Sequence, residues 1–272
     1  MKVVLFCGGA GMRLRDYSEK IPKPLVEVGP RPILWHLMSY YARYGHTDFV
    51  LCLGHGGSAI KEYFLKYDEC ASNDFVLSDG GRTIELLSRD IDTWRITFVD
   101  TGLHATIGQR LMAVREHVAG DEMFLANYSD GLSDVELDGY VDYFRERGKI
   151  ACFLSVAAPH TFHIVHADEQ HHVQKLEAVG RSIVRINGGF FVFRREIFDY
   201  IKEGEDLVLE PFDRLMESRQ LLAYPFDGFW RNMDTFKDKQ ELDDLVRQGI
   251  TPWKTPRPRP RDGALPPAGT VR

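Results

Sequence analysis

Two stretches near the start of the chain carry residue types that suit phosphate binding. Gly8, Gly9 and Gly11 directly follow a short apolar run, in the sequence Gly-Gly-Ala-Gly-Met-Arg. Glycines at such a point let backbone N–H groups approach an anion that side chains would otherwise obstruct. Lys23 lies between two prolines, which restrict the backbone on both sides and thereby set the direction of the lysine. Together the two stretches predict a nucleotide-binding site with a fixed cation.

Other interpretations of these stretches stay open. A tight turn between a strand and a helix also collects glycine, and a rigid turn could carry Lys23 incidentally. The glycine run is not a Walker A loop, because no Gly-Lys-Ser/Thr follows it. The dinucleotide fingerprint would require a glycine where Leu14 stands, which argues against a dehydrogenase.

Two aspartates are candidate metal ligands. Asp130 follows the apolar run 123–126 and precedes a glycine, and Asp234 precedes the helical pattern 235–248. Carboxylates, phosphate oxygens and water are the usual ligands of Mg²⁺ bound with a nucleotide. Ser-Asp-Gly is also a good turn sequence, and an aspartate before a helix is a good N-cap, so both structural alternatives stay open.

The elements expected to position these residues follow an alternating pattern. Uniformly apolar runs predict strands covered on both faces at 2–7, 49–53, 96–99, 123–126, 150–157 and 190–193. Helical patterns lie between them at 32–45, 107–118 and 137–148. This alternation predicts a Rossmann-like three-layer α/β fold with a mostly parallel mixed central sheet. Beyond residue 159 we expect hairpins and loops, then helices near 206–218 and 235–248.

Composition excludes several classes of protein. Among the 272 residues, Lys plus Arg total 34 and Asp plus Glu total 40, so the net charge is −6 and general nucleic-acid binding is not expected. The sequence has no apolar run near the ~20 residues that a membrane helix needs, and no secretory signal is expected. The four cysteines show no CxxC or CxH spacing of the kind that binds metals, and three of them lie in apolar runs, where we expect buried thiols. We therefore expect a cytoplasmic protein.

The end of the chain differs from the rest. Six of the 13 prolines lie from Pro252 onward, alternating in part with arginines. Such a segment cannot bury an apolar face, so residues 255–272 are expected to form a disordered Pro/Arg-rich tail.

Several motifs resemble those of one enzyme family. The stretch GGAGMRL…PKPLVEVGPRPILWH is similar to the N-terminal signature of sugar-1-phosphate nucleotidyltransferases, and PILWH resembles the glucose-1-phosphate cytidylyltransferase branch. The resemblance continues in VDTG at 99–102, SDG at 129–131, INGGFFVF at 186–193 and GFWRNMDTFKDKQEL at 228–242. It implies a nucleotidyltransferase domain over 1–254, with a nucleotide-binding part of about 1–135 and an acceptor-binding part of about 136–254.

The resemblance also implies a reaction and its partners. A sugar-1-phosphate oxygen attacks the α-phosphorus of a nucleoside triphosphate, most simply CTP, and pyrophosphate leaves. Mg²⁺ is the implied cofactor, and a homo-oligomer is the implied assembly. Arg13 and Lys23 match the catalytic cations, with Arg13 on the pyrophosphate side and Lys23 near the α-phosphate. Asp130 and Asp234 match the metal ligands.

Further positions match the two substrates. Gly108 corresponds to a place where the family brings backbone close to the base, although Ile107 and Gln109 depart from the family sequence there. Glu177 and Asn187 match acceptor-binding residues. Ala178 stands where the family carries a lysine that grips the sugar phosphate.

The loss of that lysine leaves two explanations. The acceptor differs from glucose 1-phosphate and another cation replaces the lysine, the candidates being Lys175, Arg181, Arg185 and His163. Alternatively, the chain has lost catalysis and retains only nucleotide binding. The presence of the other matched residues favours the first explanation.

A histidine-rich segment covers residues 160–172 and holds five of the ten histidines. An exposed hairpin is the favoured interpretation, a part of the acceptor pocket is the second, and a structural metal site is the third, since the stretch carries no cysteine partner.

Overall fold

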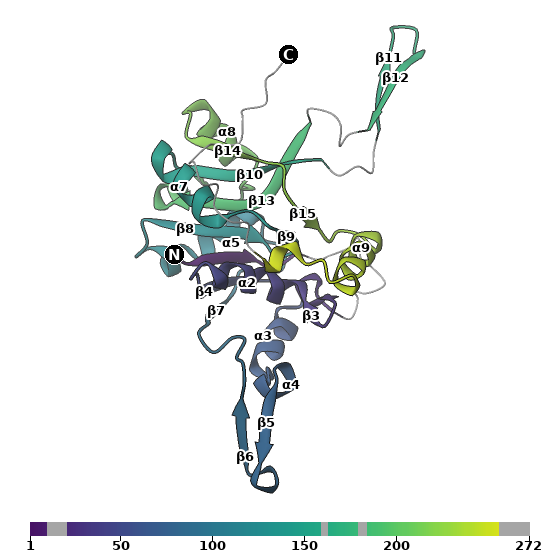
Figure 1. The fold of residues 1–272 in the computed structure, drawn as a ribbon. Coiled ribbons are helices and arrows are strands. Elements are labelled where there is room, and N and C mark those ends of the chain that lie inside the picture. The colour runs from purple at the N-terminus through teal and green to yellow at the C-terminus, as the bar shows by residue number, and fades with distance from the viewer. Residues whose placement is uncertain (10–20, 159–162, 179–183, 256–272) are drawn as a thin grey trace.

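A central sheet organises the protein in a computed structural model that describes residues 1–9, 21–158, 163–178 and 184–255. In these residues the sheet has seven strands in the order β14-β10-β13-β8-β1-β4-β7 (Figure 1). The strands are β1 (Val3–Phe6), β4 (Asp48–Leu53), β7 (Arg95–Asp100), β8 (Met123–Tyr128), β10 (Ala151–Ala157), β13 (Arg185–Arg194) and β14 (Leu221–Phe226). Only β13 runs antiparallel to its neighbours in this sheet, so the predicted mostly parallel mixed sheet is confirmed.

Helices cover both faces of the sheet, which is why its strands read as uniformly apolar. Along β1, Val3 and Leu5 belong to the hydrophobic cluster that includes α2 and α7, whereas Val4 and Phe6 belong to the cluster with α5 and α8. The α-helices are α2 (Ile33–Arg43), α3 (Gly57–Leu65), α4 (Glu69–Ser72), α5 (Ile107–Ala113), α6 (Arg115–Val118), α7 (Leu137–Arg147), α8 (Glu210–Glu217) and α9 (Phe236–Arg247). The 3₁₀ turns are η2 (Lys23–Leu25), η3 (Asp79–Gly81), η5 (Arg195–Tyr200) and η6 (Pro252–Lys254).

Most predicted elements are present, and the differences have local causes. The six expected strands all lie in the central sheet. The edge strand β14 was not predicted, because Pro225 interrupts its pattern; an edge position tolerates a proline. The single helix expected at 107–118 is divided at Val114 into α5 and α6.

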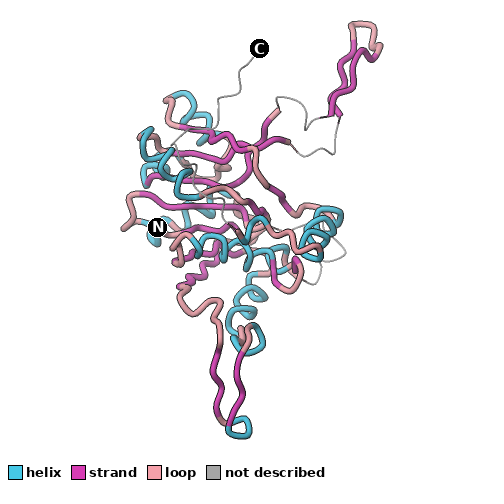
Figure 2. The backbone as a smooth tube through the Cα atoms, in the orientation of Figure 1, coloured by secondary structure: helices cyan, strands magenta, loops and turns pink. Residues whose placement is uncertain are grey.

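Four small two-stranded sheets accompany the central one among the described residues. They are β2–β3 (Glu27–Val28, Arg31–Pro32), β9–β15 (Gly131–Ser133, Trp230–Asn232), β5–β6 (Phe75–Ser78, Thr83–Leu86) and β11–β12 (His163–Ala167, Val173–Ala178). Figure 2 shows β5–β6 and β11–β12 as hairpins that project from opposite ends of the molecule. The expectation of an exposed histidine-rich hairpin is confirmed by β11–β12 for its described residues.

The described residues include no helix that combines the length and the apolar character needed to span a membrane. The predicted disordered tail lies almost entirely outside the described residues, which end at Thr255.

Candidate functional site

Lys23 binds two aspartates that are far from it in the sequence. Its Nζ donates to Oδ2 of Asp130 over 2.5 Å and to Oδ1 of Asp234 over 2.6 Å. The lysine begins η2, whose proline-flanked backbone holds it in place. The structure therefore brings together three of the residues that the sequence singled out, and it does so around one cation.

Asp130 is positioned by the end of β8 and by a small ribbon. The Ser129 hydroxyl donates to the Phe6 carbonyl over 2.9 Å and so ties this turn to the end of β1. The Met233 N–H donates to the Asp130 carbonyl over 2.9 Å, and β15 pairs with β9 so that Asn232 faces Gly131. Because β9 and β15 form one ribbon, Asp130 and Asp234 lie next to each other at one end of it, and both reach Lys23.

Asp234 does not cap the helix that follows it. Thr235 is the N-cap of α9 and forms a capping box with Asp238, which also accepts a hydrogen bond from the Asp234 N–H over 3.0 Å. The N-cap alternative for Asp234 is therefore wrong, because a neighbouring threonine performs that task. The Asp234 carboxylate instead accepts hydrogen bonds from Lys23 and from the amide of Asn232.

Two opposing effects act on the charge of Lys23. Burial lowers the pKa of the lysine, but the two neighbouring carboxylates raise it by more, so its pKa lies above the ordinary value. Lys23 is therefore protonated at neutral pH and acts as a fixed positive charge rather than as a proton acceptor.

The donor set at this point fits a hard divalent cation. The carboxylates of Asp130 and Asp234 are held next to each other by the ammonium group of Lys23. Mg²⁺ sites on nucleotides commonly use one or two carboxylates together with phosphate oxygens and water. Among the residues that the structure describes, no three or more His, Cys, Asp or Glu side chains are grouped so that they alone could hold a metal ion. Asp130 and Asp234 are thus suited to a metal that arrives with phosphate.

The two described glycines of the N-terminal loop have different surroundings. Gly8 is buried, and a Cβ there would lie 2.1 Å from Nη1 of Arg110, so its missing side chain makes room for that guanidinium. Gly9 is exposed, and a Cβ there would meet no described atom within 4 Å. Gly11 and Arg13 lie outside the described residues.

Sequence reasoning missed Arg110, which is 3% exposed. Its guanidinium binds backbone carbonyls at or just after the ends of β1, β4 and β7. The only signal in the sequence is a charged residue on the otherwise apolar stripe of a helix.

Gly108 is buried in the first turn of α5, where a Cβ would lie 2.4 Å from the carbonyl oxygen of Glu205. This close approach explains the glycine by packing, and a role for Gly108 at the base of the nucleotide stays a prediction. Gln109, which departs from the family sequence, completes a capping box with Thr106 at the start of the same helix.

The two predicted acceptor residues lie in different places. Asn187 lies near the start of β13, at the sheet edge where β8 and β10 end, and its side-chain oxygen accepts a hydrogen bond from the Gly189 N–H over 2.9 Å. Glu177 lies on the β11–β12 hairpin, which stands away from the sheet (Figure 1). The structure therefore places Asn187, but not Glu177, at the edge that carries Asp130.

The four candidates to replace the family lysine that is absent at Ala178 differ in the contacts they make. Arg185 binds the Ser155 and Phe226 carbonyls and pairs with Asp227, which makes it a clamp between β10, β13 and β14. Lys175 pairs with Glu177 over 2.7 Å and lowers the pKa of that carboxyl. His163 begins the same exposed hairpin, and Arg181 lies outside the described residues.

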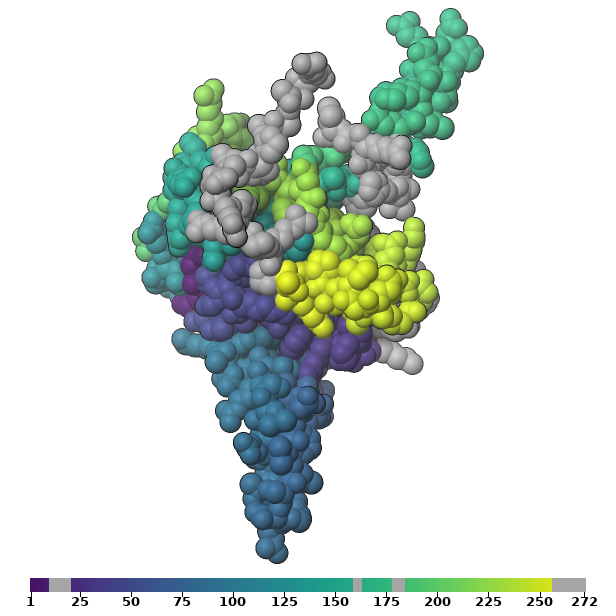
Figure 3. Space-filling view, viewed as in Figure 1, coloured from purple at the N-terminus to yellow at the C-terminus, as the bar shows by residue number. Residues whose placement is uncertain are grey.

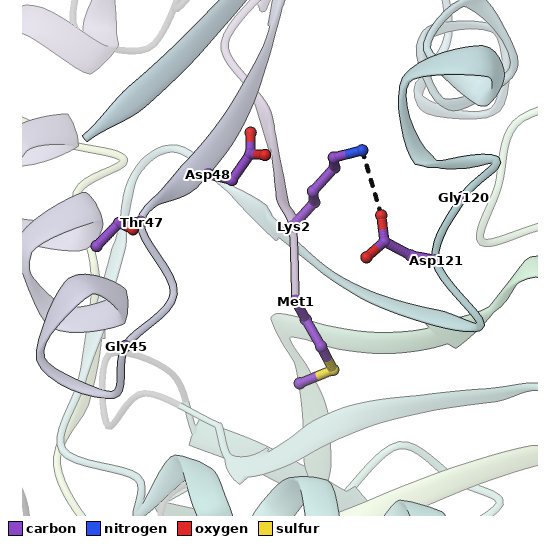
Figure 4. A pocket seen from close by; sticks show the side chains of 7 residues that line it. All are labelled: Met1, Lys2, Gly45, Thr47, Asp48, Gly120 and Asp121. Carbon is purple, nitrogen blue, oxygen red and sulfur yellow. Dashed lines mark ion pairs between the residues drawn. The ribbon is translucent and has the colours of Figure 1, made fainter. Parts of the chain in front are cut away.

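A hollow of about 350 Å³ lies at the opposite edge of the sheet from Lys23 (Figure 4). It is lined by residues that precede or begin β1, β4 and β8, and Lys2 there already pairs with Asp121 over 3.3 Å. The residues that could bind phosphate and metal are at the other edge, where the carboxyl ends of the parallel strands meet. Ligands of open α/β sheets bind at that edge.

Comparison with known proteins identifies the family. Residues 2–248 match the nucleotidyl transferase family. The chain is 35% identical over 256 residues to a probable glucose-1-phosphate cytidylyltransferase of Bacillus subtilis, covering 93% of this chain and 99% of that protein. It is 36% identical over 258 residues to the glucose-1-phosphate cytidylyltransferase of Salmonella typhimurium, covering 94% and 99%.

A solved structure agrees in fold. A putative glucose-1-phosphate thymidylyltransferase from Bacillus anthracis superposes with a TM-score of 0.66 at 17% identity, covering 91% of this chain and 95% of that one. The resemblance drawn from the sequence motifs is thus confirmed over nearly the whole chain, and this protein belongs to the nucleotidyl transferase family.

Proposed function

We propose that this protein condenses a nucleoside triphosphate, CTP in the first place, with a sugar 1-phosphate or a related phosphorylated acceptor. The products are a nucleoside-diphosphate sugar and pyrophosphate. The observation that carries the proposal is the convergence of Lys23, Asp130 and Asp234 at the carboxyl edge of the sheet. Family membership and the cytidylyltransferase relatives support the reaction class and the choice of CTP.

The reaction joins two anions, so positioning and charge stabilisation are the main catalytic tasks. The acceptor phosphate oxygen forms a bond to the α-phosphorus, and the bond from that phosphorus to the bridging oxygen of pyrophosphate breaks. Lys23 supplies a fixed positive charge for the α-phosphate, and Arg13 supplies another for the departing pyrophosphate. The peptide of Gly9, with Gly8 and Gly11, contributes backbone donors to the phosphates.

Asp130 and Asp234 would hold the Mg²⁺ ion. When bound, the metal supplies positive charge to the phosphate oxygens and restrains their orientation. The fit of two neighbouring carboxylates to a hard cation supports this assignment.

We assign nucleotide binding to about 1–135 and acceptor binding to about 136–254. Asn187 is the acceptor residue with most structural support, because it shares the sheet edge with Asp130. Glu177 would join it only if the β11–β12 hairpin approached that edge. Because Ala178 replaces the family lysine, we expect an acceptor other than glucose 1-phosphate.

The direct test is a screen for Mg²⁺-dependent pyrophosphate release. CTP, dTTP, UTP, GTP and ATP are each combined with a panel of sugar 1-phosphates, and products are identified by mass spectrometry. Product formation with CTP at the highest kcat/KM supports the proposal. Nucleotide binding without pyrophosphate release from any pair would favour a non-catalytic, regulatory nucleotide-binding protein instead.

We also propose that copies of the chain associate through the β5–β6 hairpin, which forms the tapered projection in Figure 3. Register pairs Phe75 with Leu86 and Leu77 with Ile84, so these four apolar side chains share one face of the hairpin. An apolar face can pack against the same face of a second copy, which is the arrangement of a two-fold interface.

A cytoplasmic location is in keeping with the four free cysteines.

A further inference from the structure

Arg110 joins the carboxyl ends of three neighbouring strands. Its Nη1 donates to the carbonyl of Leu53, the last residue of β4, over 3.0 Å and to the carbonyl of Gly102, two residues after β7, over 2.9 Å. Its Nη2 donates to the Gly8 carbonyl over 3.1 Å, just after β1. A single side chain from α5 thus fixes the relative positions of three strand ends.

The guanidinium of Arg110 fits only because two neighbouring residues, Gly8 and Gly54, have no side chain. A Cβ at Gly8 would lie 2.1 Å from Nη1 of Arg110, and a Cβ at Gly54 would lie 2.7 Å from the same atom. Glycine at both positions therefore lets the backbone close around the arginine. The missing side chain of Gly8, which begins the N-terminal loop, makes room for Arg110 rather than for a ligand.

The bond to Gly8 also determines how the next peptide group faces. The Gly8 carbonyl accepts hydrogen bonds from Arg110 and, over 3.3 Å, from the His55 N–H, so its direction is fixed toward the protein interior. In a planar trans peptide the N–H of the following residue points the opposite way. The Gly9 N–H is therefore turned away from Arg110, and Gly9 itself is exposed.

The charge of Arg110 contributes as well. In the described part of the chain its hydrogen-bond acceptors are neutral, namely backbone carbonyls and the Thr101 hydroxyl. The charge of this buried cation, which the Asp100 carboxylate offsets in part, adds positive potential at its end of the sheet and so favours an anionic ligand there.

We propose that Arg110 is a positioning residue for the nucleoside triphosphate. It acts through the backbone: its guanidinium ties β1, β4 and β7 together and holds the Gly9 N–H toward the phosphates. This inference rests on the proposed function, because it takes the triphosphate as the ligand of the loop. Arg110 itself touches protein carbonyls and not the substrate.

Arg110→Lys tests the proposal while keeping the charge. A lysine cannot reproduce the planar set of donors that reaches three strand ends. We expect the KM for the nucleotide to rise about tenfold or more, as expected for displaced charge-assisted donors, with the KM for the acceptor unchanged. Thr101→Val, which removes one acceptor at 2.7 Å, should raise the nucleotide KM by a smaller factor and serves as the milder variant.

Arg194→Lys is the matched control. Arg194 is also largely buried, with a side chain 20% exposed, but it lies at the opposite edge of the sheet, where β13 ends beside the start of β8. If Arg110 has only a structural role, Arg110→Lys and Arg194→Lys will both have a lower melting temperature, and both will keep the wild-type KM for the nucleotide. That result would overturn the inference.

Measurements on the wild-type protein distinguish a failure of the Arg110 role from a failure of the proposed function. Wild-type turnover with a nucleoside triphosphate, together with an unchanged nucleotide KM in Arg110→Lys and Thr101→Val, rejects only the role of Arg110. No turnover and no calorimetric binding of any nucleoside triphosphate by the wild type rejects the proposed function and the inference with it.

Discussion

At the scale of single residues, the site depends on one lysine held between two carboxylates. Lys23 is restrained by its backbone, and its side chain is only 14% exposed. Its protonated state is favoured by Asp130 and Asp234, so its charge does not depend on pH near neutrality. The residues that make the site are therefore fixed in direction and charge before any substrate arrives.

Replacing Lys23 with alanine should reduce turnover by about a hundredfold or more, because a positioned charge would be missing where charge develops. The fold should persist, since the residues around Lys23 remain packed. Steady-state rates and a thermal melt measure the two effects. Lys2→Ala is the control: Lys2 also pairs with an aspartate, Asp121, but at the opposite sheet edge, and its loss should leave turnover intact. A near-wild-type rate for Lys23→Ala would remove the lysine from the site.

At the scale of elements, helix α2 is anchored by a buried histidine. The His36 Nε2 lies 2.8 Å from the Val28 carbonyl, and its Nδ1 accepts from the Trp253 indole over 3.4 Å. These contacts join α2 to β2 and η6. Burial lowers the pKa of His36 to about 4, although the bond to Val28 opposes the shift.

This histidine predicts an acid-dependent loss of stability. In the unfolded chain His36 would take up a proton near pH 6.5, whereas in the folded protein it stays neutral until about pH 4. The unfolded state therefore binds more protons between these values, and the free energy of unfolding falls as the pH is lowered through them.

The contribution of His36 to this loss is roughly 3 kcal/mol, which chemical denaturation at pH 7, 5.5 and 4.5 would measure. The variant His36→Gln should show a shallower dependence on pH over the same window. An equal slope in the variant and the wild type would mean that other groups cause the loss.

At the scale of the whole molecule, the β5–β6 hairpin is unusual because it exposes apolar side chains that a single chain leaves in contact with solvent. A two-stranded hairpin is marginally stable by itself, yet this one presents apolar side chains to solvent, with Leu77 58% and Ile84 53% exposed. Its base is firmly held, because Arg31 binds Asp90 and Ser72 across it. A rigid, uncovered apolar face favours association with another copy.

Leu77→Asp should weaken this association by placing a charge in the apolar interface. Light scattering after size exclusion should show a smaller assembly for this variant than for the wild type. Ser78→Asp introduces the same charge on the other face of the hairpin and should leave the mass unchanged. A wild-type protein that is monomeric at micromolar concentration would contradict the assembly proposal.

Much of this arrangement could be predicted from the sequence. The central strands could be predicted because strands buried on both faces are uniformly apolar. Lys23 could be singled out because a proline stands on each side of it. Arg110 and the N-cap role of Thr235 could not be predicted, because each depends on which neighbours the fold brings within hydrogen-bonding distance. The β5–β6 hairpin was missed since its apolar residues resemble those of a short buried strand.

Asp130 and Asp234 are proposed to hold a divalent metal beside Lys23 for nucleotidyl transfer. Mg²⁺-dependent pyrophosphate release by the wild type, Asp130→Asn and Asp234→Asn tests it most directly. Asparagine preserves size but removes the charge that a hard cation needs, so we predict about a hundredfold lower turnover in each variant, with a higher Mg²⁺ requirement. Turnover and Mg²⁺ dependence equal to those of the wild type in both variants would contradict the account.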